Sequence, residues 1–212
     1  MDNDHDEDDL RPVHTERTLR AFAEACYGNA CSLFGSATLL DQRAPAHRAL
    51  VFASIGLEEF GKAIVATVAA IRTETGDTGD RLPRKVADHR TKRLFATRAR
   101  ETRLGLEEFI AELAQKPLAV LLRTAREEAR TYYATGGRGL SAPEWRAAAL
   151  YVDFAPDGSI TDPRKVTLLA AVEVGILEAV LRKYHALSAI LSDDNDWSRF
   201  AKSVRRRSTG PR

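Results

Sequence analysis

The segment GLEEFGKAI (residues 56–64) places three charged side chains in a stretch that is otherwise almost wholly apolar. Glu58 and Lys62 are four residues apart and Glu59 is three before Lys62, so they could pair along one helical turn. If the helix is central, a glutamate is buried there and needs a partner, from Lys62 or from another helix. Gly61 costs about 1 kcal/mol against alanine in a helix interior, which indicates close approach by another helix or backbone. The plainer alternative is an exposed ion pair on a solvent strip.

Two carboxylates in a helical bundle also raise the question of a di-iron or di-manganese site. Ferritin-like sites take a Glu-x-x-His pair from each of two helices. None of the five histidines has a glutamate three residues before it. The sequence therefore predicts no metal site of this kind, and we expect no other cofactor.

A second group of candidate residues lies in the segment 81–103, which carries nine basic residues against two acidic ones. Such a run fits a phosphate-binding surface, and more often a solvated helix face. His89 lies within it. Imidazole can transfer protons near neutral pH while neighbouring cations hold a phosphate, so His89 is the candidate acid–base group. Three of its neighbours are predicted to contact RNA: Lys85, Arg90 and Arg93.

Helical periodicity predicts the elements that must position these groups. We expect a first helix over 15–41 and a second over 45–72, which is apolar nearly all round and therefore central. A third helix is expected from 83 to 114, and a fourth after Pro117.

A change of pattern follows the fourth helix. We expect a short helix over 144–150, then a small β-hairpin from YVDF and SIT around the turn APDG. The last long helix would run from Asp162 to about Leu191. The predicted fold is therefore all-α, a helical bundle with a short β-hairpin-like insertion before the last long helix.

Charge divides the 212 residues into an acidic tail (1–14), a helical domain (15–193) and a basic tail (194–212), both tails being read as solvated. The longest clean apolar run, 63–71, is far shorter than the roughly 20 residues that a membrane-spanning helix needs. We expect no membrane association and no secretion signal, and hence a cytoplasmic protein. Cys26 and Cys31 are expected to be small buried thiols rather than zinc ligands or a disulfide.

Three blocks together resemble the AbiV-type abortive infection family, a branch of the HEPN superfamily: HRALVFASIGLEEFGKAI (47–64), DHRTK (88–92) and WRAAALYVDFAPDGSITDP (145–163). The family combines an EE-x-GK helix, a later H-x-x-K and an arginine some residues before YVD. The resemblance spans most of the chain. Arg84 and His89 also fit the R-x4-H form of the HEPN ribonuclease motif, a match that arises readily by chance.

The resemblance implies an all-helical antiphage effector that stops growth of the infected cell through RNA damage or translation arrest. It implies a metal-independent endoribonuclease that acts on RNA as a homodimer, with a phage-encoded activator or protein partner as a further expectation. His89 would be the general acid or base, and Arg84 or Lys92 would stabilise charge on the phosphorane, giving a 2′,3′-cyclic phosphate. Lys85 replaces the usual polar residue after the motif arginine, which weakens the assignment of Arg84 more than that of His89.

The predicted supporting cluster consists of polar residues from the resembling blocks: Glu58, Glu59, Lys62, Arg146, Tyr151 and Asp153. The two glutamates and Lys62 would orient the catalytic groups or support the cleft. The YVDF block would pack nearby, with Asp153 paired to Arg146 or Lys62.

Two other functions fit the same sequence. A non-catalytic HEPN module would bind a protein or RNA partner in a defence or toxin–antitoxin system; it would need the basic segment but not His89. A purely structural bundle would use EE-x-GK only as an internal ion-pair network. In that protein, loss of Glu58 or Glu59 would cost much stability without any effect on nucleic acids.

Overall fold

The computed structural model of the chain describes residues 14–43, 46–73, 88–134, 153–154, 160–161 and 167–209. Its helices are α1 (Glu16–Arg43), α2 (Ala46–Thr73), α3 (His89–Glu101), α4 (Leu106–Ala114), α5 (Leu118–Ala134), α7 (Thr167–Lys183), α8 (Ala186–Ser192) and α9 (Asp194–Thr209). Two short strands are β1 (Asp153–Phe154) and β2 (Ile160–Thr161). The predicted all-α bundle is confirmed. No helix in these described ranges is long and apolar enough to cross a bilayer.

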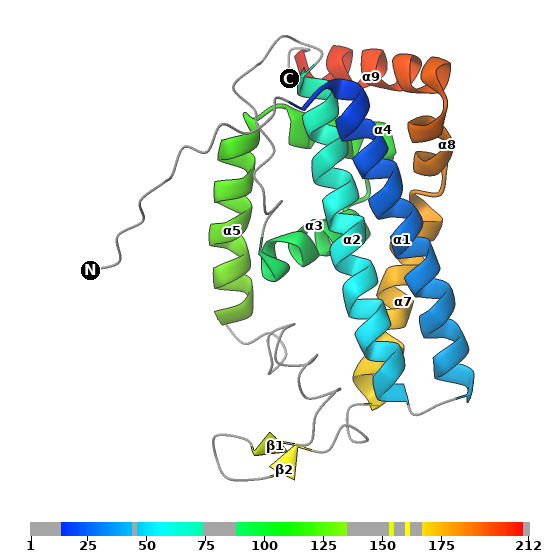
Figure 1. The fold of residues 1–212 in the computed structure, drawn as a ribbon. Coiled ribbons are helices and arrows are strands. Elements are labelled where there is room, and N and C mark those ends of the chain that lie inside the picture. The colour runs from blue at the N-terminus through cyan, green and yellow to red at the C-terminus, as the bar shows by residue number, and fades with distance from the viewer. Residues whose placement is uncertain are drawn as a thin grey trace.

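Helices α1 and α2 lie antiparallel along each other and match their expected ranges (Figure 1). α2 is the central element, as its apolar composition predicted, because α1, α3, α4 and α7 all pack against it. Its side chains Leu50, Phe60 and Ile64 are fully buried. α3 contacts both α2 and α5, so it lies between the centre of the bundle and the outlying α5 (Figure 1).

The expected third helix is two helices, α3 and α4. Thr102 leaves the helical conformation with φ −65° and ψ 147°. Gly105 is the N-cap of α4, and its backbone N–H donates to the Glu108 carboxylate at 2.9 Å. Two adjacent glutamates in the first turn of α4 favour a helix N-terminus there through the macrodipole. The apolar periodicity continues across the break, which is why periodicity alone missed it.

The β-hairpin-like insertion is confirmed in the residues that the structure describes. β1 and β2 pair antiparallel, with Asp153 opposite Thr161 and Phe154 opposite Ile160. The expected short helix over 144–150 lies outside the described residues.

The expected last long helix is also divided. α7 ends at Lys183, and α8 begins after the turn at Tyr184 and His185. The buried hydroxyl of Tyr27 lies 3.2 Å from the carbonyl oxygens of both Leu181 and Tyr184, so its single hydrogen is shared between them at the end of α7. No proline or glycine marks this break in the sequence.

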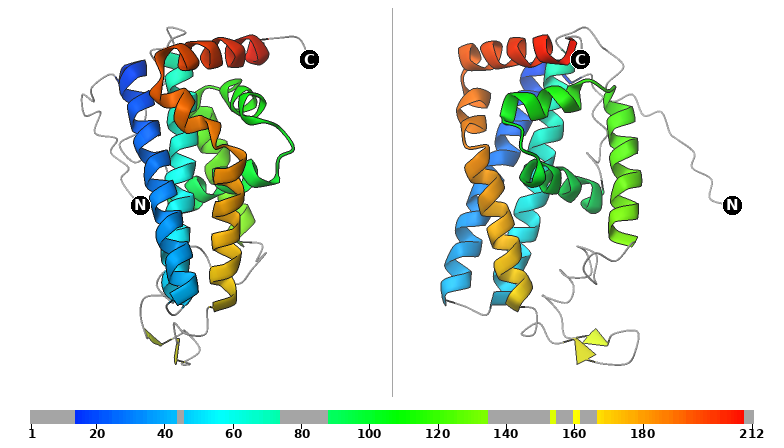
Figure 2. Two further views of the ribbon diagram at one scale, coloured as in Figure 1. Left: turned by 90° about the vertical axis from the view of Figure 1, so that its right-hand side faces the viewer. Right: turned by 180° about the vertical axis from the view of Figure 1, so that it is seen from behind.

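Residues 194–212 differ most from expectation, because 194–209 form α9 instead of a solvated tail. α9 lies across the end of the α1–α2 pair (Figure 2). Its apolar side is buried and consists of Trp197, Phe200, Ala201 and Val204. Their i, i+3, i+4, i+7 spacing is that of an amphipathic helix. Charge obscured this spacing in the sequence, because five cationic residues lie within 194–209.

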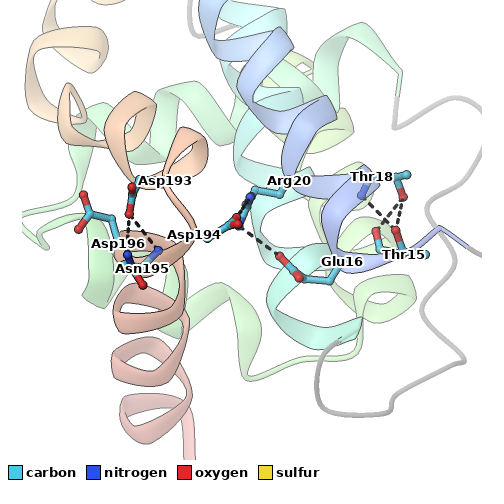
Figure 3. A network of polar contacts seen from close by, with 8 residues as sticks. All are labelled: Thr15, Glu16, Thr18, Arg20, Asp193, Asp194, Asn195 and Asp196. Atoms are coloured by element: carbon cyan, nitrogen blue, oxygen red, sulfur yellow. Dashed lines mark hydrogen bonds and ion pairs between the residues drawn. The ribbon is translucent and has the colours of Figure 1, made fainter.

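Polar contacts hold the start of α9 against the start of α1 (Figure 3). Asp193 caps α9 by accepting from the backbone N–H groups of Asn195 and Asp196, at 2.9 and 2.8 Å. Arg20 of α1 pairs with Asp194 and lies over the ring of Trp197, 5.9 Å from its centroid. Trp197 is therefore a buried packing residue between α9 and α1.

The two cysteines have different environments. Cys26 is buried and Cys31 is exposed, and both are free. Burial, and secondarily the charge of nearby Glu59, raises the pKa of Cys26 to about 12, so its thiol stays neutral at ordinary pH. The expectation of a buried thiol holds for Cys26 and is wrong for Cys31.

Candidate functional site

A buried carboxylate and a half-exposed imidazole meet where α3 begins beside the middle of α2. Glu58 Oε2 lies 2.5 Å from His89 Nδ1. The side chains are 4% and 52% exposed, so the pair reaches from the interior to the surface. A carboxylate only accepts hydrogen bonds, so Nδ1 carries the hydrogen and donates it. The lone pair of the neutral ring is then on Nε2, and the imidazole is held in one orientation.

Lys92 shares the same carboxylate. Its Nζ lies 3.6 Å from Glu58 Oε2, and its side chain is 10% exposed. His89 and Lys92 are three residues apart on α3, which places both on the side that faces α2. The sequence correctly required a partner for a buried glutamate, and the structure supplies it from α3.

Glu59 and Lys62 form a separate ion pair one turn apart on α2. Their side chains are 13% and 26% exposed, so this pair lies at the wetter edge of the helix. The two alternatives left open by the sequence thus apply to different residues. Glu58 is the buried carboxylate, and Glu59 with Lys62 is the ordinary near-surface pair.

Gly61 allows α3 to approach α2 closely enough for these contacts. A Cβ atom at Gly61 would lie 2.1 Å from the carbonyl oxygen of Lys92 and 2.8 Å from its carbonyl carbon. The predicted close approach of another backbone is therefore confirmed. The crossing point is one turn from Glu58 on α2 and at Lys92 on α3, so it fixes the separation of the interacting side chains.

Arg93 anchors α3 from inside the bundle. Its guanidinium donates to both oxygens of Glu173 on α7, at 2.8 and 2.7 Å, and to Ser54 Oγ on α2 at 2.9 Å. Arg93 is only 6% exposed. The predicted contact of Arg93 with RNA is therefore wrong, because its charge is already satisfied in the interior.

The other end of α3 is held by the end of α7. Lys183 Nζ donates to the carbonyls of Ala99 and Thr102, at 2.9 and 2.5 Å, and Tyr184 donates to Ala99 at 3.0 Å. These donors satisfy carbonyls that have no partner within α3. α3 therefore has tertiary contacts at Arg93, at its C-terminus and at its crossing with α2, and these contacts position the helix that carries His89.

A pocket of about 260 Å³ opens beside His89, between α3 and α5. It is lined by Asp88, His89, Arg90, Arg126, Ala129 and Arg130. Three guanidinium groups face one carboxylate there, so the pocket favours anions. Arg90, which the sequence predicted to contact RNA, is one of the residues that line this pocket. In the described ranges, no cluster of three or more His, Cys, Asp or Glu side chains could hold a metal ion.

The protein family described as AbiV, a HEPN family, has a model that matches residues 18–181. The chain belongs to the AbiV family. No curated protein and no solved structure matches it significantly. The matched range runs from α1 into α7, so it contains Glu58, Gly61, His89 and Lys92, and ends before α8 and α9.

Several predicted site residues of this AbiV-family chain are not described by the structure. Arg84, Lys85, Arg146 and Tyr151 lie outside the described residues, and only the backbone of Asp153 is described. The pairing of Asp153 with Arg146 or Lys62 therefore stays a prediction, as does the role of Arg84.

Arg126 and Arg130 line the pocket although the sequence did not mark them as site residues. They lie on α5, outside the basic segment 81–103. Their spacing of four residues was a signal that they share one face of the fourth helix. Nothing in the sequence showed that this face lies opposite His89, since that depends on how α5 packs against α3.

Asp88 caps α3 and should contribute pH-dependent stability. Its Oδ1 accepts from the backbone N–H of Thr91 at 2.9 Å, and its Oδ2 accepts from the Thr91 hydroxyl at 3.0 Å. Partial burial would raise the pKa of Asp88, but these hydrogen bonds outweigh it and hold the pKa below the ordinary 3.8. The stabilisation is therefore present above the unfolded pKa and is lost as the pH falls through the folded pKa.

We expect Asp88→Ala to lower the free energy of unfolding by about 1 kcal/mol near neutral pH. Asp88→Asn retains a capping oxygen and should cost less. The difference in the free energy of unfolding between wild type and Asp88→Ala, measured by urea unfolding, should become smaller as the pH is lowered from about 7 toward about 2. A gap that stays constant over this range would mean that the carboxylate does not supply the cap.

The Arg93–Glu173 pair gives a second stability prediction. Glu173→Ala should lower the free energy of unfolding by about 3–5 kcal/mol, because the buried guanidinium loses its counter-charge. Glu178→Ala on the same helix is the matched control, since Glu178 pairs with an 80% exposed Arg182. It should cost less than about 1 kcal/mol. Equal losses in urea titrations of the two variants would contradict the burial of the pair.

Proposed function

We propose that this AbiV-family protein is an antiphage abortive-infection effector that cleaves RNA and thereby arrests translation and growth of the infected cell. The observation that supports it best is the placement of His89. Its imidazole is half exposed, is oriented by the buried Glu58, and borders a pocket rich in arginine. A histidine in that setting has the properties of a general base acting beside a bound phosphate.

The proposed reaction needs one proton acceptor and a cationic environment. His89 Nε2 takes the proton of a ribose 2′-OH, and the 2′-oxygen forms a bond to the adjacent phosphorus. The bond from phosphorus to the 5′-oxygen breaks, and that oxygen takes a proton from solvent. The products are a 2′,3′-cyclic phosphate and a 5′-hydroxyl end. Glu58 favours the imidazolium that forms, as the carboxylate does in a hydrolase triad.

Three residues are candidates for the cation that stabilises the phosphorane. Lys92 is mostly buried and lies against Glu58, which favours a role in holding that carboxylate over contact with substrate. Arg90 lies on the pocket wall and is the better candidate among the described predicted residues. Arg84 stays the candidate that the HEPN motif implies.

The proposal includes a homodimer, which the HEPN resemblance implies, and no cofactor. The residues named above supply proton transfer and charge stabilisation without a metal. A phage-encoded activator would decide when the effector acts.

In vitro cleavage tests the proposal. Purified protein is incubated with end-labelled single-stranded RNA, with and without EDTA, and the product ends are analysed. We expect cleavage that EDTA does not inhibit, with 2′,3′-cyclic phosphate and 5′-hydroxyl ends. Products with 5′-phosphate ends, or cleavage that requires a divalent metal, would contradict the mechanism.

The non-catalytic HEPN module is the second candidate, and one observation favours it. A buried Glu58 needs neighbours whether or not chemistry occurs, so His89 and Lys92 could be only its partners. On that account the protein binds RNA or a protein partner through its basic surface and leaves RNA intact. Binding without cleavage in the same assay would favour this candidate.

A further inference from the structure

We propose that α5 supplies a phosphate subsite, in which Arg126 and Arg130 bind a backbone phosphate of single-stranded RNA next to the one on which His89 acts. The identity of the ligand rests on the proposed function. The subsite itself rests on the pocket beside His89 and on the charges of α5. Arg126 and Arg130 form one wall of that pocket, and the start of α3 forms the other.

The packing of α5 explains why the two arginines point into one space. Ala125 and Ala129 are 0% and 1% exposed and form the buried side of α5. Arg126 and Arg130 follow these alanines directly, so both stand along one edge of that side. Ala129 lines the pocket, and its small side chain leaves room between the guanidinium groups and α3.

The positive charges of the two arginines are only weakly offset by nearby negative charges. Arg126 is 55% exposed, and its Nε lies 3.7 Å from Asp88 Oδ2, a contact that is worth little at an exposed site. The side chain of Arg130 is exposed and makes no hydrogen bond or ion pair with the residues that the structure describes. Asp88 is itself engaged by Thr91. The pocket therefore retains net positive charge, which the N-terminus of α3 increases.

The size and chemistry of the pocket favour a phosphate group. Pockets for whole small molecules measure about 300–1,000 Å³, and this one is about 260 Å³. Guanidinium groups match phosphate oxygens in pairs, and Arg is preferred where that geometry matters. His89 on the same wall places a bound phosphate beside the acid–base group. A strand bound by Arg126 and Arg130 would therefore run past His89.

The test uses fluorescein-labelled single-stranded RNA with 2′-O-methyl groups, which cannot be cleaved through the 2′-oxygen. Its affinity is measured by anisotropy at several salt concentrations for wild type, Arg126→Ala/Arg130→Ala and Arg123→Ala. Arg123 is the matched control, because it is exposed on α5 and does not line the pocket. We expect the double variant to bind at least about tenfold more weakly. Its slope of log K against log salt should be smaller in magnitude by about 0.7, since the two arginines contact one phosphate and each phosphate contact with a single strand contributes about 0.7. The Arg123→Ala control should bind RNA within about twofold of wild type and keep the wild-type salt slope.

Two further experiments distinguish free phosphate from the phosphates of RNA, and loss of charge from loss of folding. Inorganic phosphate is titrated against thermal unfolding of the same proteins. Arginine-dependent stabilisation by phosphate together with unchanged RNA affinity would overturn the proposal, because the pocket would then take free phosphate. Arg126→Lys/Arg130→Lys keeps both charges and should recover most of the salt slope. If it does not, although its thermal unfolding matches that of wild type, the charges of α5 are not the phosphate contacts.

The subsite and the proposed activity can fail separately. Loss of RNA affinity in Arg126→Ala/Arg130→Ala, from a wild type that never cleaves RNA, would support the subsite and contradict the nuclease. Unchanged affinity and salt slope in the double variant, from a wild type that cleaves RNA, would contradict the subsite and leave the nuclease standing.

Discussion

Replacing His89 by alanine should lower the rate of RNA cleavage by roughly 10²–10⁴-fold, the usual contribution of a positioned general acid or base. The loss should fall on kcat, because alanine removes the proton acceptor and leaves the arginines of the pocket in place. RNA affinity should therefore change little. Single-turnover cleavage together with anisotropy binding measures both effects on one protein. A variant that binds RNA normally and cleaves it at the wild-type rate would remove His89 from the mechanism.

The glutamates beside His89 provide a matched pair of variants for the same prediction. Glu58→Gln removes the charge that Nδ1 of His89 contacts, whereas Glu59→Gln removes one that pairs with Lys62 and lies near Cys26. Both changes keep the shape of the side chain. We expect the Glu58 variant to lose kcat about tenfold or more, and the Glu59 variant to lose far less. Equal losses would mean that Glu58 does not position the imidazole.

Gly61→Ala should be among the most destabilising single-methyl additions in the chain. The new Cβ would meet the backbone carbonyl of Lys92 at 2.1 Å, and a backbone cannot move aside as a side-chain tip can. We expect a loss of about 3 kcal/mol, at the upper end for overpacking, which exceeds the roughly 1 kcal/mol that alanine gains in a helix. Because α3 must move away from α2, the contact between Glu58 and His89 should be lost as well, and cleavage with it.

Two other helical glycines make this prediction sharp. Gly28 has nothing within 4 Å of a built Cβ, so Gly28→Ala should stabilise the protein by up to about 1 kcal/mol. Gly56 is intermediate, since its Cβ would lie 2.5 Å from Cδ2 of Leu177, a side chain that can rotate. Urea unfolding should rank the variants Gly28→Ala, Gly56→Ala and Gly61→Ala in falling stability. A Gly61→Ala variant as stable as Gly28→Ala would contradict the close crossing of α2 and α3.

The sequence predicted those parts of the site where a residue is unfavourable in its local surroundings. Charges and a glycine in an apolar helix are costly, so Glu58 needed a partner and Gly61 needed a close neighbour. Both inferences are confirmed. Periodicity likewise predicted α1, α2 and α5, because each carries an uninterrupted apolar stripe.

The other features of the fold and site depend on packing between helices that are far apart in the sequence. The breaks between α3 and α4 and between α7 and α8 interrupt no apolar stripe. Arg93 lies in a basic run yet is buried, because Glu173, eighty residues away, meets it inside the bundle. Arg126 and Arg130 face His89 only because α5 packs against α3. Such pairings are set by where helices cross.

The most direct test of the central claim follows growth and total RNA in phage-infected cells that express either wild type or His89→Ala. The wild type should arrest growth while cellular RNA is fragmented, and His89→Ala, expressed at the same level, should do neither. Arrest that persists in the His89→Ala cells with intact RNA would contradict a nuclease site at His89.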